Sequence, residues 1–218
     1  MMEKVKLAVK TFLQDMFAHP LYLITHPIKG FYEFKRENKA KTYVAWVYLA
    51  LMCLLSMVQY LANGFIINRN DPNRFNAYLT IIIVVAPVIL VTVGNWSATA
   101  LMDGKGTMSD IFKLICYSLF PVVIIGFPLV IISNYITLEE VNFINIMSLI
   151  SMIIMGYMVF FGFMGIHEYS VSKNIFSILA TILAVAVIIF ICLLFLTLIQ
   201  QFVSFIIAIY KEIVFRFF

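Results

Sequence analysis

Two short segments carry residue types that could do chemistry. His167 and Glu168 begin like the helix of a zinc protease, in which a second histidine four residues later shares the face of the first. That position holds Val171. The sequence GKGT at 104–107 resembles the end of a phosphate-binding loop, but there a hydroxyl residue must directly follow the lysine. We therefore predict no catalytic residue, no metal site and no cofactor.

Composition indicates what must position these residues. Hydrophobic residues make up 63% of the 218-residue chain, only 12% are charged, and the mean hydropathy is +1.02. That is more apolar surface than one globular core can bury, so we expect the lipid bilayer to be the solvent. The net charge of +4 is too small, and too concentrated near the start, to suggest a nucleic-acid partner.

Long apolar runs predict an all-α, polytopic membrane protein. Each run spans 21 to 26 residues and lacks the alternation of a strand, so each should form a helix that crosses a hydrocarbon core of about 30 Å. Small residues such as Gly94, Gly162 and Gly165 predict the faces where these helices approach closely. The five expected transmembrane helices are 42–62, 77–100, 111–132, 143–166 and 174–199.

The basic residues predict how the chain is oriented. Segments before, between and after the runs alternate between two sides, and 11 Lys and Arg fall on one side against 4 on the other. Basic residues are retained in the cytoplasm. We therefore expect a multi-pass protein of the plasma membrane with its N-terminus in the cytoplasm and its C-terminus outside.

Both flanking segments are amphipathic. Residues 1–41 should form a cytoplasmic, basic segment whose apolar face includes Val5, Val9, Phe12 and Met16, followed by a stretch where aromatic residues such as Phe31 alternate with lysines. This pattern is typical of an anchor on an anionic leaflet, or of a surface that docks a partner. Residues 200–218 should form an external interfacial helix that continues the fifth span. The expected domains are thus 1–41, 42–199 and 200–218.

A cluster of polar and aromatic residues should form at the cytoplasmic face. If the second and fourth spans end at the same depth, their turns meet there, with Asn95 and Trp96 one to two turns inside. These residues could be ordinary helix-end structure, a docking site for a protein or a lipid headgroup, or a catalytic site. The residues expected to dock a partner are Phe12, Met16, Phe31, Asn95, Trp96, Asp103, Lys105, His167, Glu168 and Tyr169.

Several motifs together resemble a known family. HPIKGFYEFKRE, LMDGKGT, YSLFPVVI and IHEYSVSK, in that order, resemble the bacterial branch of the Yip family (Ypt-interacting-protein domain) over about residues 26–199. The resemblance implies a five-helix domain with a cytoplasmic N-terminus and no established catalytic residues. Eukaryotic members of the family look like trafficking adaptors, and some bacterial relatives resemble accessory proteins of sugar ABC importers.

Three functions are compatible with this sequence. The first is a non-enzymatic accessory or adaptor subunit that packs among membrane lipids against a larger complex, such as the permease subunits of a carbohydrate ABC importer. The second is a small-solute transporter or channel, and the third is an intramembrane enzyme. We favour the first because Lys113, near the end of a run, is the single charged residue within the five runs. Transport paths and proton relays normally place ionisable groups at membrane depth.

Overall fold

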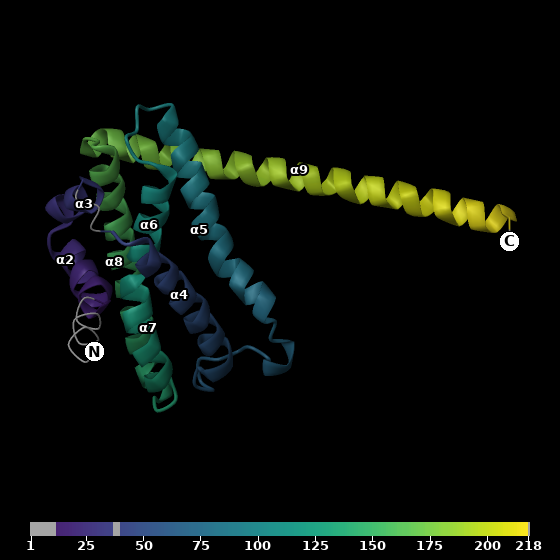
Figure 1. Ribbon diagram of the computed structural model, residues 1–218. Coiled ribbons are helices and arrows are strands. Elements are labelled where there is room, and N and C mark those ends of the chain that lie inside the picture. Colours follow the sequence, from purple (N-terminus) through teal and green to yellow (C-terminus); the bar gives the residue numbers. More distant parts are fainter. Residues whose placement is uncertain (1–11, 37–39, 218) are drawn as a thin grey trace, which may run out of the picture.

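The computed structural model describes residues 12–36 and 40–217, and in these ranges the regular structure is entirely helical (Figure 1). Five helical segments are long and apolar enough to cross a membrane: Thr42–Ala62, Ala77–Ala100, Met108–Ser133, Leu138–His167 and Val171–Arg216. The predicted all-α fold is therefore confirmed. Val5 and Val9, expected on the N-terminal amphipathic face, lie outside the described residues.

The N-terminal segment packs along the bundle as short helices. A π-helical turn, Gln14–Ala18 (η1), leads directly into α2, His19–Thr25, because Pro20 lies in the first turn of α2, where its missing N–H is not needed. The chain breaks at His26 and continues as α3, Pro27–Arg36. Gly30, Phe31 and Phe34 form the buried face of α3, which packs against α8.

The third span lies at the centre of the molecule. It consists of α6, Met108–Ser118, and α7, Phe120–Ser133, which are separated at Leu119 just before Pro121. Proline has no N–H to continue the helical ladder, which explains the break at this point. Around α6 and α7 lie α4, Thr42–Ala62, α5, Ala77–Ala100, and α8, Val141–His167. Tyr48 packs edge-on against Tyr117 and Phe120, with ring centroids 5.9 and 5.7 Å apart.

Hydrogen bonds join the loops at the end of the bundle away from α3. The N–H of Gly64 donates to Ser133 Oγ over 2.8 Å, and Asn134 Nδ2 donates to the Ala62 carbonyl over 3.0 Å. These bonds join the end of α4 to the end of α7. Two short 3-10 helices, Pro72–Arg74 (η2) and Leu138–Glu140 (η3), lie in the loops at this end.

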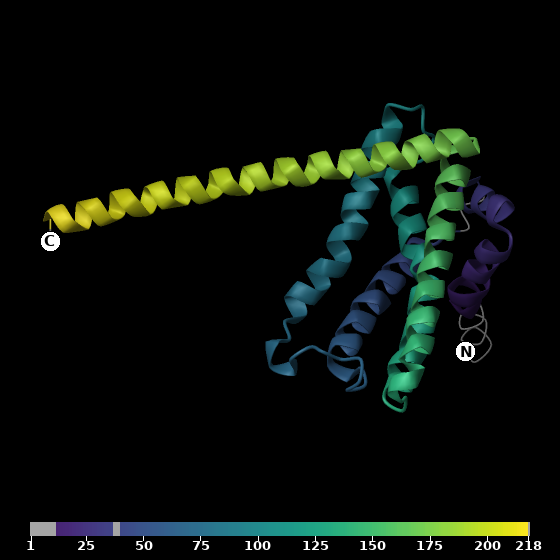
Figure 2. The same cartoon turned by 180° about the vertical axis from the view of Figure 1, so that it is seen from behind.

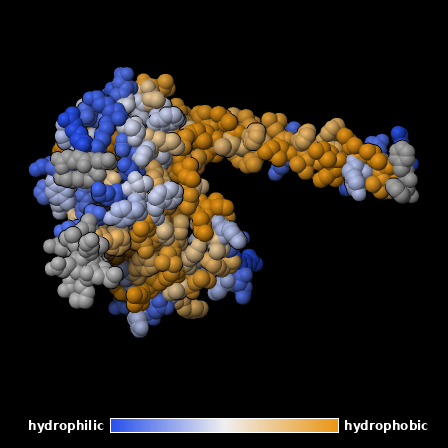
Figure 3. Space-filling view, in the orientation of Figure 1, coloured by the Kyte–Doolittle hydropathy of each residue, from blue (hydrophilic) through white to orange (hydrophobic). Residues whose placement is uncertain are grey.

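The last helix, α9, Val171–Phe217, runs across the end of the bundle and away from it (Figures 1 and 2). Its first half packs against α5, and a Cβ on Gly94 would lie 2.5 Å from Val185 Cγ2, which confirms the close approach predicted there. Side chains 189–216 are all exposed, and apolar residues cover nearly the whole length of α9 (Figure 3). At 1.5 Å per residue its 47 residues extend about 70 Å, more than twice a hydrocarbon core.

Candidate functional site

The predicted cytoplasmic cluster forms where α5 and α8 end. An acidic residue in the left-handed conformation follows each helix: Glu168 comes directly after α8, and Asp103 lies in the turn after α5, and each has φ of 55°. In each case the next residue donates its N–H to the carbonyl five residues back, at 2.8 Å after Asp103 and 3.1 Å after Glu168. Among the described residues no other non-glycine has a positive φ. This conformation is uncommon for residues other than glycine, and it turns the chain sharply. Both turns, the one after α5 and the one after α8, lie at the same end of the bundle.

Two glycines let the loop after α5 lie against His167. A Cβ on Gly104 would lie 2.7 Å from His167 Nδ1 and 2.9 Å from the Thr99 carbonyl. A Cβ on Gly106 would lie 2.5 Å from Ile166 Cγ2 and 2.7 Å from His167 Cε1. Neither glycine has a positive φ, so it is close packing and not backbone geometry that requires a glycine at both positions. The glycines that resembled a phosphate-binding loop thus make room for a histidine.

His167 is the centre of a buried chain of hydrogen bonds. The Gly106 N–H donates to His167 Nδ1 over 3.3 Å, so Nδ1 is the acceptor nitrogen and Nε2 carries the hydrogen. Nε2 donates to Asn95 Oδ1 over 3.0 Å, and Asn95 Nδ2 donates to Thr181 Oγ1 over 2.9 Å. The Thr181 hydroxyl in turn donates to the Ser177 carbonyl over 2.7 Å. A neutral imidazole therefore joins α5, α8, α9 and the loop after α5.

Lys35 joins α3 to the same cluster. Its Nζ donates to the Lys105 carbonyl over 2.8 Å and to the Ile166 carbonyl, in the last turn of α8, over 2.9 Å. A cation at this end of a helix is favourable because the last carbonyls have no partners within the helix. Burial lowers the pKa of Lys35, while the carboxylate of Glu168 acts in the opposite direction.

Glu168 is the carboxylate that the cluster presents to solvent. Its Oε2 accepts a hydrogen bond from Lys105 Nζ over 2.5 Å, and its Oε1 lies 3.9 Å from Arg36 Nη2. The hydrogen bond from Lys105 is the main cause that lowers the pKa of Glu168 below its ordinary value. A carboxyl whose pKa is lower in the folded protein stabilises the fold at neutral pH, and the effect is lost as the pH falls through that pKa.

Tyr169 closes the site on the side of α9. Its hydroxyl donates to the Met102 carbonyl over 3.0 Å, and its ring stacks on His167 with centroids 5.2 Å apart. Lys173 Nζ lies 4.6 Å from the centre of the same ring. Burial raises the pKa of Tyr169, and the carboxylate of Asp103 adds to this effect. The tyrosine therefore remains a neutral hydrogen-bond donor.

The structure brings together most of the residues predicted for this cluster, but they face different ways. Asp103, Lys105 and Glu168 are exposed, whereas Asn95, His167 and Tyr169 are buried in the contacts just described. Trp96, on α5, is half exposed. Lys35 and Thr181 belong to the cluster but were not predicted.

The N-terminal residues predicted for docking do not share one surface. Met16 is buried and its carbonyl accepts a hydrogen bond from Tyr48 Oη. Phe31 is also buried. It packs so close to Gly165 that a Cβ added to this glycine would lie only 2.7 Å from Phe31 Cβ. Phe12 remains half exposed. Both buried side chains fill the protein's own core, since an apolar helix face can pack on any neighbour, and their contact with a partner stays a prediction.

The chemistry of the cluster is that of a structural junction with a charged outer surface. Both nitrogens of His167 are occupied by hydrogen bonds within the chain. In ranges 12–36 and 40–217, no group of three or more His, Cys, Asp or Glu could hold a metal ion. What the cluster offers to another molecule is therefore its outer side, with Asp103, Lys105 and Glu168.

Comparison with known proteins gives one match. The model of the Yip1 domain family matches residues 21–210, which is most of the chain and includes all five candidate spans except the end of α9. No curated protein and no solved structure matches the chain. The match begins within α2 and therefore includes α3 and the cluster at the ends of α5 and α8.

Proposed function

The chain belongs to the Yip1 domain family, and on that premise we propose that it is a non-enzymatic accessory or adaptor subunit of a larger membrane complex. The partner that we propose is the membrane domain of a carbohydrate ABC importer, bound through its permease subunits. The family resemblance of the sequence motifs supports this class of partner. The structure supports the adaptor role through the way in which its polar and apolar groups are distributed.

The observation that carries the proposal is the apolar surface of the second half of α9, which does not pack against the rest of the chain. Residues 189–216 of α9 are exposed along about 40 Å of helix and are mainly apolar. Part of this length exceeds what one crossing of a bilayer requires. A helix of this kind can bind along another membrane protein, where apolar side chains gain packing contacts that lipid does not provide.

The interior gives little support to a transporter. Of Asp, Glu, His, Lys and Arg, the five apolar runs contain only Lys113, whose Nζ lies 3.7 Å from Asp110 Oδ1, one turn earlier in α6. The pair therefore lies near the end of the span and not at its midpoint. Asn95, a polar residue within the second span, is fully buried and bonded to His167 and Thr181.

The proposal predicts that the exposed carboxylates contribute to partner binding. Replacing Asp103 with Asn and Glu168 with Gln keeps side-chain shape and removes two charges from the outer side of the cluster. We expect this double variant to recover several-fold less permease than wild type when the tagged protein is extracted in mild detergent, because charge-assisted contacts are lost. The measurement is quantitative mass spectrometry of the co-purified proteins.

The matched control is Glu139→Gln in η3, at the other end of the bundle, where the side chain is also exposed. It should leave co-purification unchanged. If both variants recover the same amount of permease, or if the wild-type protein recovers none, the accessory role with this partner is wrong. If the purified protein alone transports a solute into liposomes, the adaptor role is wrong.

The topology predicted from the basic residues can be tested separately. In a variant whose native Cys53, Cys116 and Cys192 are replaced by alanine, a cysteine introduced at Asn70 should react with a membrane-impermeant thiol reagent in intact cells. A cysteine introduced at Ser109 should react after the cells are broken open and not before. Both positions are exposed in the folded chain, so orientation and not burial decides the result. The reverse pattern would contradict a cytoplasmic N-terminus.

A further inference from the structure

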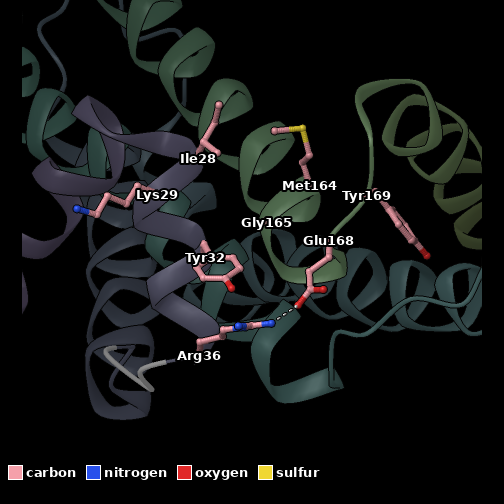
Figure 4. Close-up of a pocket in the computed structure, with 8 residues that line it drawn as sticks. All are labelled: Ile28, Lys29, Tyr32, Arg36, Met164, Gly165, Glu168 and Tyr169. Carbon is pink, nitrogen blue, oxygen red and sulfur yellow. Dashed lines mark ion pairs between the residues drawn. The ribbon is translucent and has the colours of Figure 1, made fainter.

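A groove of about 520 Å³ lies between α3 and the end of α8 (Figure 4). It is open to the surface and is separate from the buried bonds of His167. Residues from both helices and from the turn after α8 form its walls. They are Ile28, Lys29, Tyr32, Arg36, Met164, Gly165, Glu168 and Tyr169.

One end of the groove is apolar. Ile28 and Met164 line this end, and Ile28 is largely exposed although it is a large aliphatic residue. Gly165 allows α3 to approach α8, since Phe31 occupies the space where a side chain would lie. An open apolar wall of this kind favours contact with a hydrocarbon chain.

The other end of the groove is polar and carries positive charge. Tyr32 and Arg36 point toward Glu168, and the Arg36 guanidinium lies 4.6 Å from the centre of the Tyr32 ring (Figure 4). Lys29 lies one turn before Tyr32 on α3 and also lines the groove, but its side chain points away from α8 and its Nζ lies 3.8 Å from Glu33 Oε1 (Figure 4). A basic residue, a tyrosine and a second basic residue thus follow each other at intervals of three and four residues.

The charge of Glu168 does not neutralise this end. Its Oε2 binds Lys105 at 2.5 Å, while its Oε1 lies 3.9 Å from one nitrogen of Arg36. The Arg36 side chain is 60% exposed, and the 3.9 Å separation is long for a charge-assisted hydrogen bond. Arginine has five N–H donors in a planar fork that fits the oxygens of a phosphate, so donors remain for another anion.

We propose that this groove binds an anionic glycerophospholipid, with Arg36 and Tyr32 on the phosphodiester, Lys29 adding positive charge at the mouth, and Ile28 with Met164 along the start of an acyl chain. A free phosphate would use the polar end alone and leave the apolar wall exposed. The helix α3 is amphipathic and packs against α8, with Phe31 and Phe34 buried and with Lys29, Tyr32 and Arg36 exposed, a pattern typical of a helix at a membrane surface. The proposal does not depend on the adaptor function.

The test compares three ligands for the purified full-length protein in a neutral detergent. Thermal unfolding is followed as short-chain phosphatidylglycerol, short-chain phosphatidylcholine or inorganic phosphate is added. We expect phosphatidylglycerol to raise Tm at concentrations where the other two have little effect. In the variant Lys29→Gln with Arg36→Gln, the apparent affinity for phosphatidylglycerol should fall about tenfold, because charge-assisted hydrogen bonds are lost.

The matched control is Arg74→Gln with Lys211→Gln, which removes the same two residue types from exposed positions in η2 and α9. It should bind phosphatidylglycerol as the wild type does. Both replaced groove residues have mostly exposed side chains, so Tm without lipid should stay within about 2 °C of wild type.

Four results would overturn the proposal. The first is equal binding of phosphatidylcholine and phosphatidylglycerol, which would mean that charge is not recognised. The second is equal binding of inorganic phosphate, which would make this a free-anion site. The third is an equal affinity for phosphatidylglycerol in the groove variant and in the control. The fourth is a groove variant that keeps its lipid but loses a co-purifying protein, which would make the groove a protein contact.

Discussion

Replacing His167 with alanine should lower the thermal stability of the purified protein by roughly 10 °C. The substitution leaves two groups without their hydrogen-bond partner: the Oδ1 of the fully buried Asn95 and the N–H of the half-buried Gly106. Each unpaired buried group costs about 1–3 kcal/mol, and the lost ring also leaves a cavity. For a chain of this size about 1 kcal/mol corresponds to a Tm change of roughly 2–4 °C.

The control for this prediction is His26→Ala. His26 is exposed, and its Nδ1 lies 2.9 Å from the hydroxyl of the adjacent Thr25. The change should shift Tm by no more than about 2 °C. His167→Gln should fall between the two, because a glutamine amide can restore one hydrogen bond but not the stacking on Tyr169. An unchanged Tm for His167→Ala, measured by thermal unfolding in detergent, would contradict the role of His167 as a junction.

The boundaries of the first two spans could be predicted to the residue from hydropathy. The expected 42–62 and 77–100 are the bounds of α4 and α5. Both runs are followed by polar, turn-forming segments, so apolar length and helix length coincide there. The third span was predicted as one run, but sequence could not show that it divides at Leu119, because Pro87 and Pro128 lie within uninterrupted helices. Whether a proline breaks a helix depends on the packing around it.

The last helix is continuous across residue 200, where the sequence analysis places a domain boundary. Residues 171–217 contain no glycine or proline, so nothing in the local sequence ends a helix before its last residues. The structure accordingly shows one helix from Val171 to Phe217. The proposed boundary at residue 200, between a fifth span and an external segment, rests on polar residues such as Gln200 and Gln201. The cysteines of the topology experiment, at positions 70 and 109, lie before α9 and do not test this boundary.

The cluster at the ends of α5 and α8 could be predicted in its membership but not in its bonds. Equal depth of the two helix ends was enough to bring Asp103, Lys105 and Glu168 together. The partners from other helices, Lys35 and Thr181, could not be predicted, because their contact with the cluster depends on how α3 and α9 pack. For the same reason periodicity could not show which apolar residues face lipid, a partner or the core.

The packing of α3 on α8 leads to the second large effect, the change Gly165→Leu. A Cβ at this position would lie 2.7 Å from Phe31 Cβ and 3.2 Å from the Phe31 backbone carbon. The backbone of α3 cannot give way as a flexible side chain can, so the leucine should force α3 off α8. This also separates Lys35 from the Ile166 carbonyl, to which Lys35 Nζ donates a hydrogen bond over 2.9 Å in the wild type.

The matched change Gly156→Leu adds the same side chain to the same helix at a position where a Cβ meets nothing within 4 Å. It removes a glycine from a helix interior, which favours the helix by up to about 1 kcal/mol. We therefore expect Gly156→Leu to keep or raise Tm and Gly165→Leu to lower it by roughly 8 °C or more, as overpacking in a core costs about 1–3 kcal/mol and the lost contacts of α3 add to it.

Hydrogen exchange distinguishes the detachment of α3 from a general loss of stability. In Gly165→Leu, the backbone amides of 27–36 should exchange at least tenfold faster than in the wild type, while those of α6 stay protected. The helix α6 packs mainly against α4, α5 and α8, and loss of the edge-on contact between Phe34 of α3 and Tyr117 of α6 leaves that packing in place. Gly156→Leu should leave both segments unchanged. Equal acceleration in α3 and α6 would show that the bundle opens as one unit, and unchanged exchange in α3 would show that the contact of Gly165 with Phe31 does not hold α3 in place.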